Sequence, residues 1–100
     1  MIVLLFAFAL FSAIGGDELH CNGCKTVVNA AHSHAVHNYV NEISKFRIFY
    51  HNECNFFRQA VAQGLGGYCF NLYSTHEAQM MAFYKANVPT TTMCANLKQC

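Results

Sequence analysis

Hydrophobic residues dominate the start of the chain and then stop abruptly at two acidic residues. Residues 1–16 contain no charged side chain, and Asp17 and Glu18 follow at once. The run is shorter than the about 20 apolar residues that a membrane-spanning helix needs. Small residues at Ala13 and Gly15 suit cleavage of a secretory leader. We therefore predict a signal peptide over residues 1–16, and a retained membrane anchor is the alternative.

Beyond this leader the apolar positions recur every three or four residues, which is the period of an amphipathic helix. One such pattern runs from Glu18 to about Ser44, and a second runs from about Lys45 to Gln63. We place the break between them in residues 41–45, although neither glycine nor proline marks it. Alternation with a period of two never persists, so the pattern does not favour strands.

Glycine and proline divide the rest of the chain. The Gly-Leu-Gly-Gly run at residues 64–67 predicts that the second helix stops there and that the chain reverses. Helical periodicity resumes over residues 68–86, where Ser74 and Thr75 can cap a new segment with Glu77 in its first turn. Pro89 then introduces a last short helix. The pattern therefore predicts one small all-α domain over residues 17–100.

Cysteines form two close pairs near the ends of the mature chain, with two single residues between them: Cys21, Cys24, Cys54, Cys69, Cys94 and Cys100. Six cysteines in a small exported domain indicate disulfides. Six thiols allow many pairings, but these positions favour a nested order, with ends tied to ends and the middle tied to itself. Zinc is the alternative. The five residues between the last two cysteines exceed the usual zinc-ligand spacing, so we expect no metal.

The charge balance excludes several classes of function. Charged residues make up 11% of the chain, and the formal net charge is +1 with neutral histidines. A nucleic-acid partner would need a dense basic footprint, so we expect none. Asp17 is the one aspartate, which excludes the His–Asp pair of a secreted phospholipase, and no serine lies in a nucleophile elbow. We therefore expect no enzyme activity and no cofactor.

The cysteine frame resembles that of the saposin-like (saposin B type) family. The matching features are two residues between the first two cysteines, 24 between the fourth and fifth, five before the last, and Pro89 shortly before Cys94. Among family branches, the short chain looks most like amoebapores and nematode caenopores. It departs from them in having 14 residues between the third and fourth cysteines and few lysines.

This resemblance implies a fold and a function. The fold would be a bundle of four or five amphipathic helices with disulfides Cys21–Cys100, Cys24–Cys94 and Cys54–Cys69. The function would be that of a secreted protein that binds anionic bacterial lipids and permeabilises the membrane as a homo-oligomer. The alternative is a non-lytic lipid-binding or lipid-transfer module, or an activator of a lipid hydrolase. A secreted interaction protein without lipid affinity is a third reading.

Bulky apolar residues of the predicted helices are the lipid-contact candidates: Phe56, Phe57, Phe70, Tyr73, Met80, Met81, Phe83 and Tyr84. Saposin-like domains bury such faces against each other or open them onto acyl chains. Adjacent residues on a helix cannot both face one narrow core, so one phenylalanine of the first pair and one of the two adjacent methionines should lie at the rim. The alternative is that all eight are ordinary core residues.

Histidines are unusually frequent, and we treat all six as candidates for a pH switch: His20, His32, His34, His37, His51 and His76. An unperturbed imidazole titrates near pH 6.5. Protonation of all six would change the net charge from +1 to +7. We therefore expect stronger attraction to anionic membranes in acid, in the extracellular space or the lumen of an acidic vesicle. The alternatives are scattered solvated histidines, or a transition-metal site at His34 and His37 that lacks a third ligand.

Overall fold

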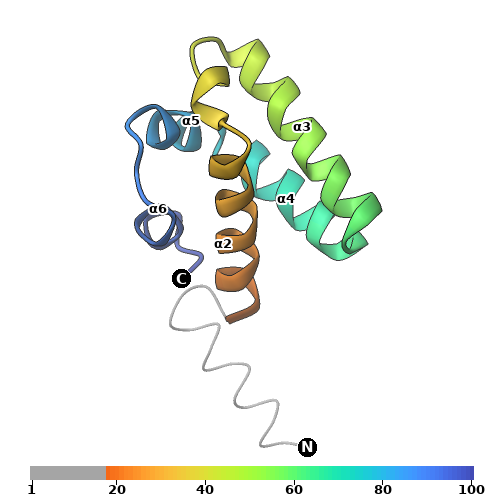
Figure 1. The fold of residues 1–100 in the computed structure, drawn as a ribbon. Helices are drawn as coiled ribbons and strands as arrows, with labels where there is room; N and C mark the ends of the chain where they lie inside the picture. Colours follow the sequence, from red (N-terminus) through yellow and green to blue (C-terminus); the bar gives the residue numbers. More distant parts are fainter. Residues whose placement is uncertain (1–17) are drawn as a thin grey trace, which may run out of the picture.

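A computed structural model describes residues 18–100 (Figure 1). The predicted signal peptide therefore lies outside the described residues. The helices are α2 (Glu18–Ser33), the 3-10 helix η1 (Val36–Tyr39), α3 (Ile43–Ala60), α4 (Gln63–Thr75), α5 (Glu77–Lys85) and α6 (Thr90–Asn96). The described chain contains no strand, which confirms the all-α prediction. None of these helices is long and apolar enough to cross a bilayer.

The first helix is shorter than the sequence predicted. α2 ends at Ser33 rather than near Ser44, because the chain turns at Ala35, whose φ of 58° is left-handed. The longer helix was predicted from an apolar row that continues through Ala35, Tyr39 and Ile43, beyond the end of α2. In the structure Tyr39 and Ile43 are 40% and 39% exposed, and the buried residues after the turn are Val36 and Val40.

The glycine cluster is also placed differently from our prediction. Residues 64–67 lie inside α4, and the chain reverses earlier, at Val61 and Ala62 between α3 and α4. A Cβ atom on Gly66 would lie 2.3 Å from the Cβ of Arg58 on α3. The glycine is therefore needed for the close approach of two helices, and not for the turn itself.

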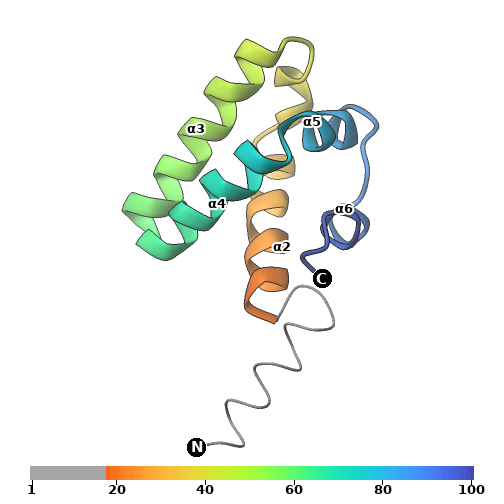
Figure 2. The same cartoon turned by 180° about the vertical axis from the view of Figure 1, so that it is seen from behind.

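The segment over residues 68–86 is divided where we expected a new helical segment to begin, with Glu77 in the first turn of the second helix. α4 ends at Thr75 and α5 begins at Glu77, with His76 between them (Figure 2). The last helix, α6, follows Pro89 as predicted.

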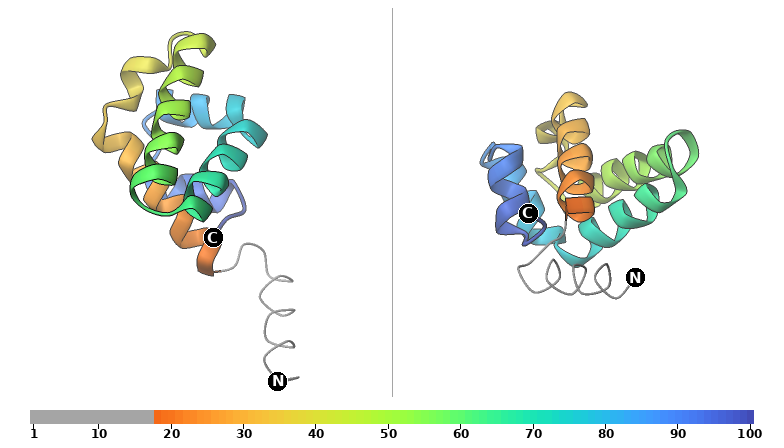
Figure 3. Two further views of the ribbon diagram at one scale, coloured as in Figure 1. Left: turned by 90° about the vertical axis from the view of Figure 1, so that its right-hand side faces the viewer. Right: turned by 90° about the horizontal axis from the view of Figure 1, so that it is seen from below.

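Disulfides group the helices into two covalent pairs. Cys21–Cys100 and Cys24–Cys94 tie α2 to α6 and its tail, and we call these the terminal pair. Cys54–Cys69 ties α3 to α4, which we call the hairpin pair. The pairing is the one that the resemblance implied, and no cysteine is free. Figure 3 shows the two pairs as separate bodies of helix.

The two ends of this bundle differ in how the pairs are joined. At the linked end, at the top of Figure 1, the chain passes between the pairs through residues 34–42 and again through residues 76–89. At the free end lie the start of α2, the α3–α4 turn and the C-terminal tail. Each disulfide stays within its own pair, so only non-covalent contacts hold the pairs together at the free end.

Candidate functional site

A hollow of about 390 Å³ opens at the free end, between α2 and the start of α4. Its lining is mostly apolar and comes from both pairs: Leu19, His20, Ala62, Gly64, Leu65 and Tyr68. This volume falls within the usual range of small-molecule pockets. The hollow exists because the first turn of α4 carries glycine where a larger side chain would fill the space; a Cβ atom on Gly64 would meet nothing within 4 Å.

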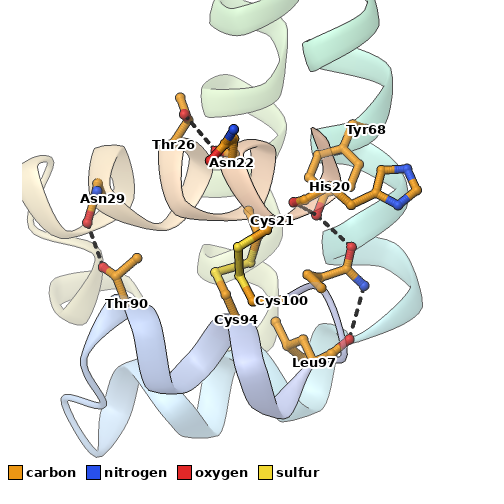
Figure 4. The surroundings of a disulfide bond; sticks show 12 residues. His20, Cys21, Asn22, Thr26, Asn29, Tyr68, Thr90, Cys94, Leu97 and Cys100 are labelled. Carbon is orange, nitrogen blue, oxygen red and sulfur yellow. Dashed lines mark hydrogen bonds between the residues drawn. A yellow bond between two sulfur atoms is a disulfide. The ribbon is translucent and has the colours of Figure 1, made fainter. Parts of the chain in front are cut away.

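Tyr68 lines one side of this hollow and lies beside His20 of α2 (Figure 4). Its ring stacks on the imidazole of His20, with centroids 5.4 Å apart. Its hydroxyl lies 3.0 Å from the carbonyl oxygen of His20 and 2.7 Å from Oε1 of Gln99. One side chain of the hairpin pair thus reaches both segments of the terminal pair at the free end.

Large apolar side chains are exposed on α2, on α3 and at the α3–α4 turn. Leu19 is 77% exposed, Val61 is 59% exposed, and Phe56 on the last half of α3 is 53% exposed. Ile48, at 63%, is equally exposed but lies on the first half of α3. Sequence reasoning named only Phe56 among these four. The signal it missed was the position of Leu19 beside the first disulfide and of Val61 at the α3–α4 turn.

The eight lipid-contact candidates do not form one surface in this structure. Four are buried in the core, namely Phe57, Tyr73, Met80 and Tyr84, and three are partly buried against it, namely Phe70, Met81 and Phe83. Phe56 is exposed while Phe57 is buried, as we predicted for neighbours on a helix. The buried candidates could reach lipid only if the two pairs moved apart.

The histidines are dispersed over the molecule rather than gathered. His20 lies at the free end, and His51 stands on α3 with its ring edge-on to Phe70. The other four lie at or close to the linked end, where His34 Nδ1 is 2.7 Å from a carboxylate oxygen of Glu53. Within residues 18–100 no three potential ligands lie together to hold a metal ion.

An aromatic core fills the linked end. Tyr73 stacks on Tyr50 with centroids 4.6 Å apart, and its hydroxyl shares a 2.9 Å hydrogen bond with that of Tyr84. Burial, and then the neighbouring Tyr84, raise the pKa of Tyr73 well above its ordinary value. Phe46 lies edge-on to all three tyrosines. The hydroxyls of Tyr73 and Tyr84 form a hydrogen bond with each other, so burying these polar groups costs little free energy.

A charged contact lies on the surface of the same end. Arg47 donates two hydrogen bonds, of 2.7 and 2.9 Å, to the carboxylate of Glu77, and Tyr50 donates a third of 2.6 Å. These bonds lower the pKa of Glu77, with Arg47 as the larger cause. Burial and the same carboxylate raise the pKa of Tyr50 to about 12. The contact fastens the start of α5 to α3 beside both links.

Comparison with known proteins gave no match to a family model, to a curated protein or to a solved structure. The saposin-like resemblance therefore continues to depend on the cysteine frame. The structure adds the all-helical bundle and the three disulfides that the resemblance implied.

Proposed function

We propose that this protein is a secreted lipid-interacting protein that binds anionic bacterial membranes and permeabilises them, more strongly in acid. The observation that carries the proposal is the placement of the disulfides. Each bridge joins helices within one pair, and the apolar core lies between pairs. The pairs can therefore separate without breaking a bridge, and acyl chains would replace the contacts that the core loses.

The free end suits the first contact with a membrane. It combines exposed Leu19 and Val61 with an apolar hollow, and the chain does not cross between the pairs there. Transfer of apolar side chains from water to hydrocarbon is favourable by roughly 25 cal/mol per Å². Exposed apolar groups of this kind commonly mark interaction surfaces.

Charge supports the acid dependence. Four of the six histidines, His20, His34, His37 and His51, are exposed to solvent. Their protonation would add positive charge to a protein whose net charge is only +1. Anionic lipid surfaces attract such charge by about 1 kcal/mol per group close to the surface.

Dye release from phosphatidylglycerol vesicles between pH 4.5 and 7.5 tests the proposal. We expect release to increase as the pH falls and to be weak with phosphatidylcholine vesicles. A profile that is flat, or that favours alkaline pH, would contradict the acid dependence.

The hollow favours a second candidate, a lipid-transfer protein, because its volume suits a single acyl chain. Such a protein would move labelled lipid between vesicles while the dye stayed inside.

Matched variants test the membrane-contacting surface. Leu19→Gln and Val61→Gln at the free end should each weaken vesicle binding several-fold. Ile48→Gln removes an equally exposed side chain from the first half of α3 and should leave binding unchanged. Equal effects at all three positions would show that general hydrophobicity, and not the free end, drives binding.

A further inference from the structure

Tyr68 packs against the terminal pair at a position where α2 carries no side chain. Its ring lies against α2 at Gly23, where an added Cβ atom would be 3.1 Å from Cε2 of the ring. Nine in ten real contacts of this kind are wider, so a side chain at this position would push the ring outward. The glycine of α2 therefore lets a residue of α4 lie flat across the free end.

The tyrosine hydroxyl meets acceptors that are already oriented toward it. The side-chain amide of Gln99 donates from Nε2 to the carbonyl oxygen of Leu97 at 3.0 Å. This bond turns Oε1 of Gln99 toward Tyr68, whose hydroxyl lies 2.7 Å away. The second acceptor, the carbonyl oxygen of His20, lies 3.0 Å from the hydroxyl.

One disulfide holds both acceptors in place. His20 precedes Cys21 in the chain and Gln99 precedes Cys100, and these two cysteines are bonded to each other with their Cα atoms 4.5 Å apart. The bridge therefore fixes the two acceptor segments side by side at the free end. The other bridge of the terminal pair, Cys24–Cys94, lies deeper in the bundle and is fully buried.

The location of the Tyr68 contact at the free end determines which motion of the two pairs it opposes. Both chain links between the pairs lie at the linked end, so separation of the pairs displaces groups at the free end the most. A hydrogen bond near the links barely changes length when the pairs begin to part, whereas one at the free end must break. Tyr68 also lines the apolar hollow, so separation of the pairs at this end would widen the entrance beside its ring.

We infer that Tyr68 is a gate on the apolar hollow, and that the Cys21–Cys100 disulfide keeps this gate shut by positioning its hydrogen-bond acceptors. The occupant of the open hollow is an acyl chain, and that part of the inference rests on the proposed function. The gate itself rests only on contacts between the two pairs.

The test compares two tyrosine hydroxyls that each make an inter-helix hydrogen bond. Tyr68→Phe removes the hydroxyl at the free end, and Tyr50→Phe removes the one that donates to Glu77 at the linked end. Hydrogen exchange is read at the amides of Gly66 and Gln99, which donate to Ala62 and Cys94 on either side of the gate. We expect Tyr68→Phe to speed exchange there roughly three- to tenfold, and Tyr50→Phe to leave it unchanged.

A double-mutant cycle tests the role of the disulfide. Replacing Cys21 and Cys100 by serine should speed the same exchange, and adding Tyr68→Phe should then have little further effect, since the acceptors are already released. Gly23→Ala provides an independent variant that displaces the ring but keeps the hydroxyl. Effects of the serine and phenylalanine variants that simply add would overturn the coupling. Equal exchange in the Tyr68→Phe and Tyr50→Phe proteins would overturn the gate.

A fluorescent long-chain fatty acid then separates the gate from the proposed function. Faster entry of the probe into Tyr68→Phe than into the unmodified protein supports both the gate and the acyl-chain occupant. If the probe binds neither protein while exchange still differs, the gate stands and the acyl-chain occupant is wrong. If the probe enters both proteins at the same rate, Tyr68 does not control access.

Discussion

The linked end and the free end of this bundle are built by different means. The linked end is held by a cluster of stacked aromatic rings, a buried pair of tyrosine hydroxyls and a surface ion pair. The free end has glycines in the first turn of α4, a hollow, and a tyrosine whose hydroxyl contacts two acceptors. The tightly packed aromatic core and the solvent-exposed apolar hollow thus lie at opposite ends, so each can be altered separately.

The largest expected effect comes from the linked end. Tyr73 is 0% exposed and contacts rings on α3 and α5, so Tyr73→Ala leaves a cavity in the centre of the core. We expect the free energy of unfolding to fall by about 3–5 kcal/mol. Urea denaturation of the oxidised protein, followed by circular dichroism, measures the loss.

Phe56→Ala is the matched change toward the free end. Its ring is 53% exposed, so we expect the free energy of unfolding to change by less than about 1 kcal/mol. Binding to phosphatidylglycerol vesicles should weaken instead. A comparison in which Phe56→Ala costs as much stability as Tyr73→Ala would remove the distinction between the two ends.

The disulfides provide the next comparison. Cys100 is exposed and Cys21 is half-buried, whereas the other four cysteines are completely buried. A dithiol reductant supplies two electrons to one bridge and is itself oxidised to a disulfide, and its thiolate must first reach a sulfur atom. Cys21–Cys100 should therefore be reduced before the other bridges.

With Cys24–Cys94 intact, loss of the outer bridge frees only short segments at the two ends. The free energy of unfolding should then fall by about 2–3 kcal/mol, at the low end of the usual range. Alkylation after brief reduction, followed by peptide mass spectrometry, identifies the opened bridge. Early labelling of Cys54 or Cys69 would contradict the assignment of access to the free end.

The sequence predicted the parts of this structure that depend on local pattern. Helical periodicity predicted the all-α fold, and the cysteine spacing suggested the disulfides through a family resemblance. The end of α2 was misplaced because Tyr39 and Ile43 continue the apolar period past Ala35, whose backbone is left-handed. The glycines of residues 64–67 were assigned to a turn because the close approach of Gly66 to Arg58 on α3 is a tertiary property.

The candidate site was less predictable for the same reason. Tyr68 and Gln99 are 31 residues apart, and no sequence pattern relates them. The aromatic residues that looked suited to lipid contact are mostly the ones that the core needs. One sequence feature could have pointed to the site: His20 and Gln99 each precede a cysteine, and the resemblance implies that these two cysteines pair.

The smallest expected effect belongs to the ion pair at the linked end. Arg47, and then Tyr50, lower the pKa of Glu77 below its ordinary value of 4.5. A lowered pKa in the folded state means that the contact stabilises the protein above the ordinary carboxyl pKa. The contribution is lost as the pH falls through the lower, folded value. Melting temperatures between pH 7 and 3 should therefore converge with those of Glu77→Gln only at the acidic extreme.

Arg47→Gln is the matched control, because it removes the partner and leaves the carboxylate. Near neutral pH its melting temperature should fall below that of the unmodified protein by as much as that of Glu77→Gln does. This decrease should be smaller in high salt, since the pair is exposed.

The ion pair stays intact at pH 5, so its release cannot cause activation in mild acid. Membrane activity that rises between pH 7 and 5 in Glu77→Gln as in the unmodified protein would locate the acid response in the exposed histidines. A flat response in the variant would instead place it at the linked end.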